Sequence, residues 1–193
     1  MSAAASNPSD KRDAILAAAI DLFAERGFYG TAVPDIATRA KVGAGTIYRY
    51  FPSKEALVNT LYRHHKARMA AAVLDGLDFA LPPRTLFGLF WRRICAFARE
   101  NATALQFLEL QHHAPYLDDA SRAAEAELLG IAHGFLAQGI QQQVFRDLSP
   151  SLLIALVWGA FRGLVQGGCD GTVTLDAATI AAAETCIWEA IRR

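Results

Sequence analysis

The sequence has few of the features by which an enzyme or a metal protein is usually recognised. It contains 3 cysteines among 193 residues. Cys95, Cys169 and Cys186 lie far apart in apolar stretches, without the spacing of a zinc site. Buried, reduced thiols of a cytosolic protein are therefore expected. The sequence also has no glycine-rich phosphate loop, no GxSxG and no HExxH. We expect no catalytic residue, no cofactor and no enzymatic activity.

Long hydrophobic runs and β patterns are also scarce. The longest apolar run, Leu152 to Phe161, ends at Arg162 and is too short to cross a bilayer. Residues 1–12 lack the apolar core of a signal peptide. No segment shows sustained alternation with β-branched residues, so a sheet is not expected. We predict an all-α, soluble, cytoplasmic protein without membrane contact.

The chain has no net charge, because 19 Lys and Arg residues balance 19 Asp and Glu residues. The distribution is nevertheless uneven. Residues 1–70 carry 10 basic against 6 acidic side chains, a charge of +4, whereas residues 71–193 carry 9 against 13, a charge of −4. The N-terminal third is therefore the part suited to nucleic-acid phosphates.

This basic third contains two short helical segments joined by a tight turn. Thr31 is placed to cap the first, and Pro34 falls in its first turn, where the missing N–H does no harm. That helix is predicted to run to about Ala40. Gly43 and Gly45 then allow the sharp turn that a helix-turn-helix needs.

A helical wheel sorts the second segment, residues 44–50, into two faces. Ile47 and Phe51, four residues apart, share the inward face, whereas Thr46 and Arg49 point outward. A short helix with small N-terminal residues and an outward arginine fits a DNA major groove. The residues predicted to contact DNA are Thr31, Ala44, Gly45, Thr46, Tyr48, Arg49, Tyr50 and Lys54.

Over some 45 residues the sequence combines Gly27-Phe28, Thr31, Asp35-Ile36-Ala37, Val42, Gly45-Thr46-Ile47-Tyr48, Tyr50-Phe51 and Ser53-Lys54-Glu55-Ala56-Leu57. This combination resembles the TetR family of bacterial transcriptional regulators. The resemblance covers Lys11 to about Leu61, and beyond that only the helical layout is similar. Gly43 departs from the family, which often has Ser or Thr there, and with Ala44 and Gly45 it leaves few side chains for direct base readout.

The resemblance implies about nine helices in two domains. Residues 1–54 would form a three-helix helix-turn-helix DNA-binding domain, and residues 55–193 a helical effector-binding and dimerisation domain. The boundary would lie inside a long helix from Ser53 to about Leu77. The implied function is a repressor that binds a near-palindromic operator on double-stranded DNA as a homodimer and is released by a small effector. An all-helical carrier of apolar ligands, or a helical enzyme, without DNA binding is the alternative.

Effectors of this family commonly bind inside the C-terminal domain. The lining proposed here is Phe87, Trp91, Phe107, His112, His113, Phe135, Trp158, Phe161 and Arg162, most of which also fit an ordinary core. Arg162 is a lone cation after ten apolar residues and is expected to need a partner, either Glu109 in an internal salt bridge or a ligand carboxylate. The many aromatic residues indicate an apolar or aromatic effector.

The last two predicted helices carry the candidate dimer contacts, since in the family they usually pair across a two-fold axis into a four-helix bundle. Glycines spaced four apart form one strip that lets a neighbouring backbone approach, and the final helix is apolar on one side. The predicted interface residues are Leu156, Gly159, Gly163, Gly167, Ile180, Ile187, Trp188 and Ile191. Packing within one subunit is the alternative.

Two histidine pairs, His64-His65 and His112-His113, raise the question of a metal site. Adjacent histidines point to different faces of a helix, so each pair offers one ligand at most. No Cys or carboxylate completes a recognised pattern. We therefore predict no metal site.

Overall fold

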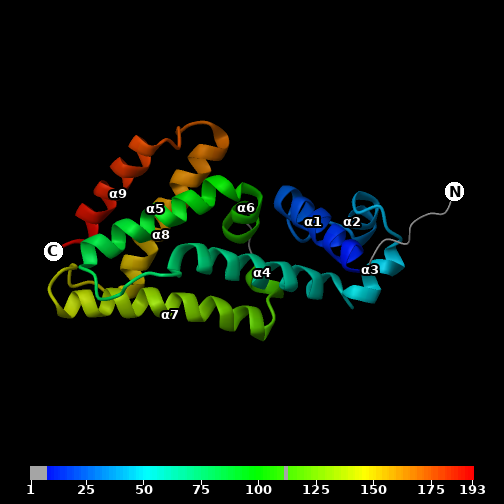
Figure 1. The fold of residues 1–193 in the computed structure, drawn as a ribbon, viewed down its shortest axis with the longest axis horizontal. Coiled ribbons are helices and arrows are strands. Elements are labelled where there is room, and N and C mark those ends of the chain that lie inside the picture. The colour runs from blue at the N-terminus through cyan, green and yellow to red at the C-terminus, as the bar shows by residue number, and fades with distance from the viewer. Residues whose placement is uncertain (1–7, 111–112) are drawn as a thin grey trace. The chain divides into compact units, whose positions relative to one another are not determined.

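The computed structural model describes residues 8–110 and 113–193. Within these residues it contains nine α-helices, one 3-10 helix and no strand, which confirms the all-α prediction (Figure 1). The elements are α1 (Pro8–Arg26), α2 (Val33–Arg39), α3 (Ala44–Tyr50), α4 (Lys54–Leu74), α5 (Pro83–Glu100), α6 (Ala102–Leu110), η1 (Ala114–Tyr116), α7 (Asp119–Gln141), α8 (Pro150–Asp170) and α9 (Ala177–Ile191).

The chain forms two compact units, and α4 passes from one into the other. The first, called the head unit below, comprises the chain up to Lys66 together with Thr103–Arg122. The second, the body unit, comprises Ala67–Ala102 and Ala123–Arg193. The predicted functional boundary after residue 54 falls within the head unit, which also takes in the first half of α4 and most of α6. That boundary stays a prediction.

The head unit is built around α1, whose apolar residues recur along one face. Four of them, Ile15, Ala19, Leu22 and Phe23, are at most 1% exposed. The helix ends before Gly27, whose φ of 69° lies in the left-handed region that favours glycine, as the sequence predicts.

Side chains cap the N-terminal ends of three helices. The Ser53 Oγ accepts a hydrogen bond from the Ala56 N–H at 3.1 Å. Ser149 and Asp176 cap α8 and α9 by accepting the N–H groups three residues on. Helix α6 ends at Leu110, and the 3-10 helix η1 begins at Ala114.

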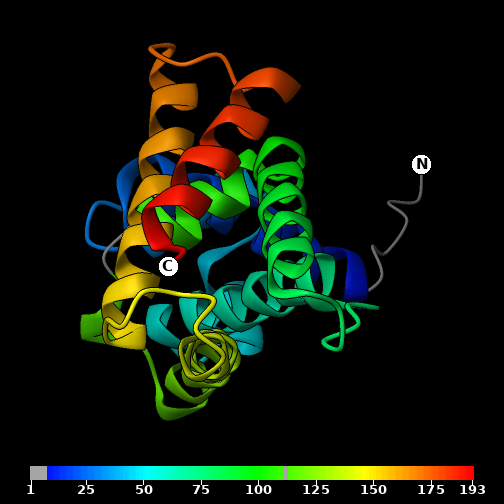
Figure 2. The ribbon, with the colours of Figure 1, turned by 90° about the vertical axis from the view of Figure 1, so that its left-hand side faces the viewer.

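The body unit has an aromatic core between α5, α8 and α9. The Trp91 indole N–H of α5 donates to the Ile180 carbonyl oxygen at 3.0 Å, and its ring meets Phe161 edge to face. The rings of Phe87 and Trp188 lie 5.6 Å apart. Helices α8 and α9 run side by side, joined by the short loop after Asp170 (Figures 1 and 2).

Candidate nucleic-acid interface

Helix α3 presents the two faces that the helical wheel predicts. Ile47 is 1% exposed and Phe51, just after the helix, is 4% exposed, so both hold α3 on the head unit. Tyr48 and Arg49 are exposed on the other side, and Thr46 is half-buried. The helix therefore offers hydroxyl and guanidinium groups to a partner while its apolar side fixes its orientation.

The tyrosines at the boundary of α3 differ in exposure. Tyr48 is 53% exposed, whereas Tyr50 is half-buried. The Arg49 guanidinium carbon lies 5.3 Å from the centre of the Tyr50 ring, within the range of a cation–π contact. Tyr50 thereby supports the outward Arg49 side chain.

The N-terminal end of α3 is bare of bulky side chains. Gly43 is the N-cap residue, and no side chain caps the helix. Gly43, Ala44 and Gly45 are all exposed, and a Cβ on Gly45 would meet nothing within 4 Å. This end of α3 can therefore approach a surface closely, although it carries few groups that distinguish one base from another.

The turn between α2 and α3 contains a residue with an unusual backbone conformation. Lys41 has a φ of 55°, in the left-handed region where glycine is the usual residue. Its N–H donates to the Thr38 carbonyl oxygen and the Val42 N–H to that of Ala37, which together form a Schellman motif. These hydrogen bonds hold the backbone of Lys41 in the left-handed conformation, and its side chain is exposed.

The predicted capping role of Thr31 is wrong. The N-cap residue of α2 is Ala32, and it makes no side-chain cap. Thr31 is 1% exposed, and its hydroxyl donates to the carbonyl oxygens of Gly27 at 2.8 Å and Leu22 at 3.1 Å. Its side chain ties the turn to the end of α1 and leaves no surface for DNA.

Lys54 has a structural role that the sequence did not reveal. Its ammonium donates to the carbonyl oxygens of Phe28 at 2.8 Å and Thr31 at 2.9 Å, and it lies 4.1 Å from the centre of the Phe28 ring. These bonds use two of its three N–H groups. Lys54 therefore ties the start of α4 to the α1–α2 turn, with one donor left for a phosphate.

A second set of contacts joins α4 to the segment before α7, inside the head unit. The Asn59 amide donates to the Tyr116 carbonyl oxygen at 2.8 Å and accepts from the Asp118 N–H at 2.9 Å. Burial raises the pKa of Asp118, but bonds from Arg63 and Ser121 outweigh it and lower the pKa to about 2. The Tyr116 ring stacks on Phe28 at 4.1 Å. Sequence spacing carries no signal for these long-range contacts.

The expected internal salt bridge between Arg162 and Glu109 is not formed. Arg162 is exposed on α8, so it needs no internal partner. Glu109 pairs instead with Lys66, at 3.0 Å, with both side chains at most 9% exposed. The pair fixes α6 on α4 within the head unit, where losing one partner would leave a buried charge.

Most of the aromatic residues predicted to line an effector pocket belong to packed cores. Phe87, Trp91 and Phe161 are at most 3% exposed in the body unit. Phe107 is fully buried in the head unit, against Phe23, and Trp158 is half-buried beside Phe161. His112 lies outside the described residues. His113 is buried in the head unit, with its Nδ1 2.9 Å from the Tyr116 hydroxyl.

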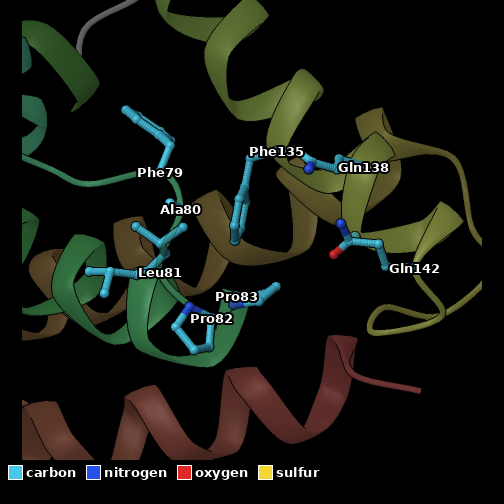
Figure 3. Close-up of a pocket in the computed structure, with 10 residues that line it drawn as sticks. Phe79, Ala80, Leu81, Pro82, Pro83, Phe135, Gln138 and Gln142 are labelled. Carbon is cyan, nitrogen blue, oxygen red and sulfur yellow. The ribbon is translucent and has the colours of Figure 1, made fainter.

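Phe135 is the predicted lining residue that does border a described pocket. The pocket opens between the α4–α5 loop and the C-terminal end of α7, with a volume of about 250 Å³ (Figure 3). Its lining residues are Phe79, Ala80, Leu81, Pro82, Pro83, Leu86, Phe135, Gln138, Gly139 and Gln142.

The predicted dimer residues divide into two groups. Leu156, at 47% exposed, and the open backbones of Gly159 and Gly163 lie on the outer face of α8. Gly167 is internal instead, because a Cβ there would come within 2.7 Å of Val173. The residues of α9 fit the alternative of packing within one subunit, while their part in a dimer stays a prediction. Ile180, Trp188 and Ile191 are at most 9% exposed in the core, and Ile187 is half-buried.

The outer face of α8 is apolar over an unusual length. By length and composition the helix could cross a membrane, since a second apolar stretch follows Arg162, so the expectation that no segment is long enough was wrong. Only 28% of its apolar window is buried within the chain. We therefore expect another apolar surface to cover the outer face of α8.

The cysteines differ in burial. Cys169 and Cys186 are exposed, contrary to the expectation of buried thiols. Cys95 is buried, and its pKa is raised to about 11 by burial and by the negative charge of Glu184.

Two family descriptions match the chain and together span most of it. Residues 15–61 match the bacterial regulatory proteins of the tetR family, and residues 72–193 match a tetracyclin repressor-like C-terminal domain. The chain belongs to the TetR family.

Relatives of known name agree with this membership. The chain is 31% identical over 180 residues to the HTH-type transcriptional repressor KstR2 of Mycobacterium tuberculosis strain H37Rv, which covers 87% of this chain and 88% of that protein. It is 30% identical over 155 residues to the HTH-type transcriptional regulator RutR of Escherichia coli K12, with 79% and 72% covered. A TetR family transcription regulator from Marinobacter aquaeolei VT8 has the same fold, with a TM-score of 0.81 over 95% of this chain and 96% of that one at 23% identity.

Proposed function

We propose that this TetR family protein is a ligand-responsive transcriptional repressor that binds a near-palindromic operator as a homodimer in the cytoplasm. The observation that carries the proposal is α3, which is anchored by Ile47 and Phe51 and exposes Tyr48 and Arg49. The family membership supports it, and the relatives named above are a repressor and a regulator. No described feature favours the carrier or enzyme alternative.

DNA binding would divide the exposed groups of the head unit by role. Arg49 and Thr46 would reach base edges or phosphates in the major groove. Tyr48, Tyr50 and the remaining Lys54 donor would position the head on the backbone. Ala44 and Gly45 would contribute a close approach without side-chain readout. The hydrogen-bonded, buried Thr31 is left out of this set.

The homodimer would form through the outer face of α8. Leu152, Leu156, Gly159 and Gly163 give this face its apolar, open surface. A two-fold pair covers the same patch on both subunits. It would also present two copies of α3 to half-sites about 34 to 36 Å apart, one turn of DNA.

Repression would follow from occupancy, and induction would be an equilibrium shift without chemistry. An effector that prefers one body conformation would move α4, which continues from the body unit into the head unit. The loss of operator affinity would equal the coupling free energy, typically about 1 to 3 kcal/mol.

Retention on duplex DNA tests the proposal. The full chain should bind random genomic duplexes at low salt and lose affinity steeply as the salt concentration rises. Protein binding releases counterions from the DNA, and this release becomes less favourable at higher salt. Selection of bound fragments should then recover an inverted repeat. A chain that ignores duplex DNA at low ionic strength would instead fit the carrier.

A further inference from the structure

We propose that the pocket between the α4–α5 loop and α7 binds a small, neutral, flat aromatic molecule that carries a hydroxyl or carbonyl group. We further propose that this molecule is the effector, a step that rests on the proposed function. The site lies within the body unit and shares Phe135 with the aromatic lining that the sequence suggested.

The lining indicates that the ligand is uncharged. None of the ten residues around the pocket carries an ionisable side chain. A charged group would find no side chain of opposite charge there, whereas a neutral group needs none. A carboxylate ligand of the kind considered for Arg162 therefore does not suit this site.

The walls indicate a flat apolar ring. The Phe135 ring projects from α7 toward Pro82 and Pro83 (Figure 3). It is held in place by an edge-to-face contact with Phe145, at 5.4 Å between ring centres, and Phe145 is itself 1% exposed. Two consecutive prolines stiffen the facing wall. A ring that slides between them would meet preformed surfaces on both sides.

The polar groups of the pocket lie at the C-terminal end of α7. Gln138 lies in the last turn of α7 and Gln142 directly follows the helix, and the amide ends of both extend toward the side of Phe135 (Figure 3). Each amide offers a donor and an acceptor. A single hydroxyl or carbonyl at the edge of the ring would be recognised by this pair.

The volume limits the size of the ligand. At about 250 Å³ the pocket is smaller than the roughly 300 to 1,000 Å³ of sites for drug-sized molecules. A molecule of one or two fused rings fits this space better than a long acyl chain or a steroid.

The pocket is also connected to the end of α4. Arg93 of α5 donates to the carbonyl oxygens of Val73 at 3.1 Å and Asp75 at 2.7 Å, which closes the C-terminal end of α4. The wall of residues 79–83 follows only a few residues later. A ligand that draws this wall onto α7 would therefore act on the end of the helix that continues into the head unit.

The test uses 2-naphthol as the probe, because it has two fused rings and one hydroxyl and is uncharged at neutral pH. Its binding to the full chain is measured by calorimetry, and operator retention is measured separately. The variants are Gln138→Ala with Gln142→Ala, and Phe135→Ala. The matched control is Gln141→Ala, an exposed glutamine of α7 that does not line the pocket.

We expect the double glutamine variant to bind 2-naphthol more weakly, by about two- to tenfold for each hydrogen bond lost. Phe135→Ala should weaken it further, and Gln141→Ala should bind like the native chain. Equal weakening by Gln141→Ala, or no binding by the native chain at about 1 mM, would overturn the site. Normal binding in a chain that ignores duplex DNA would overturn the repressor and keep the pocket. Normal binding that leaves operator affinity unchanged would overturn only its role as effector site.

Discussion

The outer faces of α3 and α8 differ in what they expose and therefore in what can cover them. Helix α3 has 7 residues, and an arginine, a tyrosine and small residues are exposed to solvent on it. Helix α8 has 21 residues and shows leucines and open glycine backbones, with little charge beyond Arg162. The face of α3 is polar enough to remain solvated in the free protein and can still bind the phosphates of DNA. Exposure of the second face to water raises the free energy of the chain, and an apolar partner that covers it is what we propose.

The largest expected effect is the loss of the dimer in Gly163→Leu. A Cβ at Gly163 meets nothing within 4 Å, so the single chain can accept the leucine, whereas the side chain would clash with a second α8 packed as we propose. We expect the dimer dissociation constant to rise by about a hundredfold or more, equivalent to roughly 2.7 kcal/mol. Sedimentation equilibrium measures it.

Gly130→Leu is the matched control for this change. Gly130 lies on α7, is exposed and also has open space around its Cβ position, but is outside the outer face of α8. This variant should remain dimeric. Dimers of Gly163→Leu with native affinity would place the subunit contact elsewhere.

Arg49→Ala should have the next largest effect, on the other face. If Arg49 contacts a base or a phosphate, its loss should weaken operator binding by about 1 to 3 kcal/mol while the dimer persists. Arg99→Ala, an exposed arginine of α5 in the body unit, controls for the change in net charge. Fluorescence anisotropy with a labelled operator measures both. Unchanged affinity would remove Arg49 from the contact set.

A comparison of α3 with α9 explains how much of the structure could be predicted from the sequence. Ile47 and Phe51 are four residues apart and both are buried, so the spacing of apolar residues alone predicts which face of α3 points inward. On α9 the apolar period is equally clear, but it cannot say whether Trp188 meets its own chain or another. In the structure Trp188 contacts Phe87 and Phe145 of the same chain, which are far away in sequence, so it is internal.

The candidate sites show the same limit. Thr31 and Lys54 fit a local pattern of cap and phosphate contact, yet both serve carbonyl oxygens of the α1–α2 turn. The pair of Lys66 and Glu109 spans residues far apart in sequence, and so no local pattern predicts it. The pocket depends on a loop and a helix end that only the fold brings together.

Lys41→Gly should have a smaller effect, on stability. A left-handed residue other than glycine costs about 1 to 2 kcal/mol, while glycine loses about 0.5 to 1 kcal/mol of chain entropy on folding. The variant should therefore gain roughly 0.5 kcal/mol, measured by urea unfolding. Its operator affinity and salt dependence should not change, since Lys41 is outside the proposed contact set. A salt slope reduced by about 0.9 would reveal a phosphate contact.

The smallest expected effect is the pH dependence of the Arg63–Asp118 contact. The folded pKa of Asp118, about 2, lies below the ordinary value of 3.8, so its charge stabilises the fold above about pH 4 and stops doing so as the pH falls toward 2. Asp118→Asn keeps the cap on Ser121 but removes the charge. We expect a small loss of stability near pH 7, because the pair is partly exposed, and convergence of the two unfolding curves toward pH 2. Asp119→Asn, the adjacent exposed carboxylate, controls for the lost charge. A difference that persisted undiminished at the lowest pH would assign the effect to packing of the amide instead of to the ion pair.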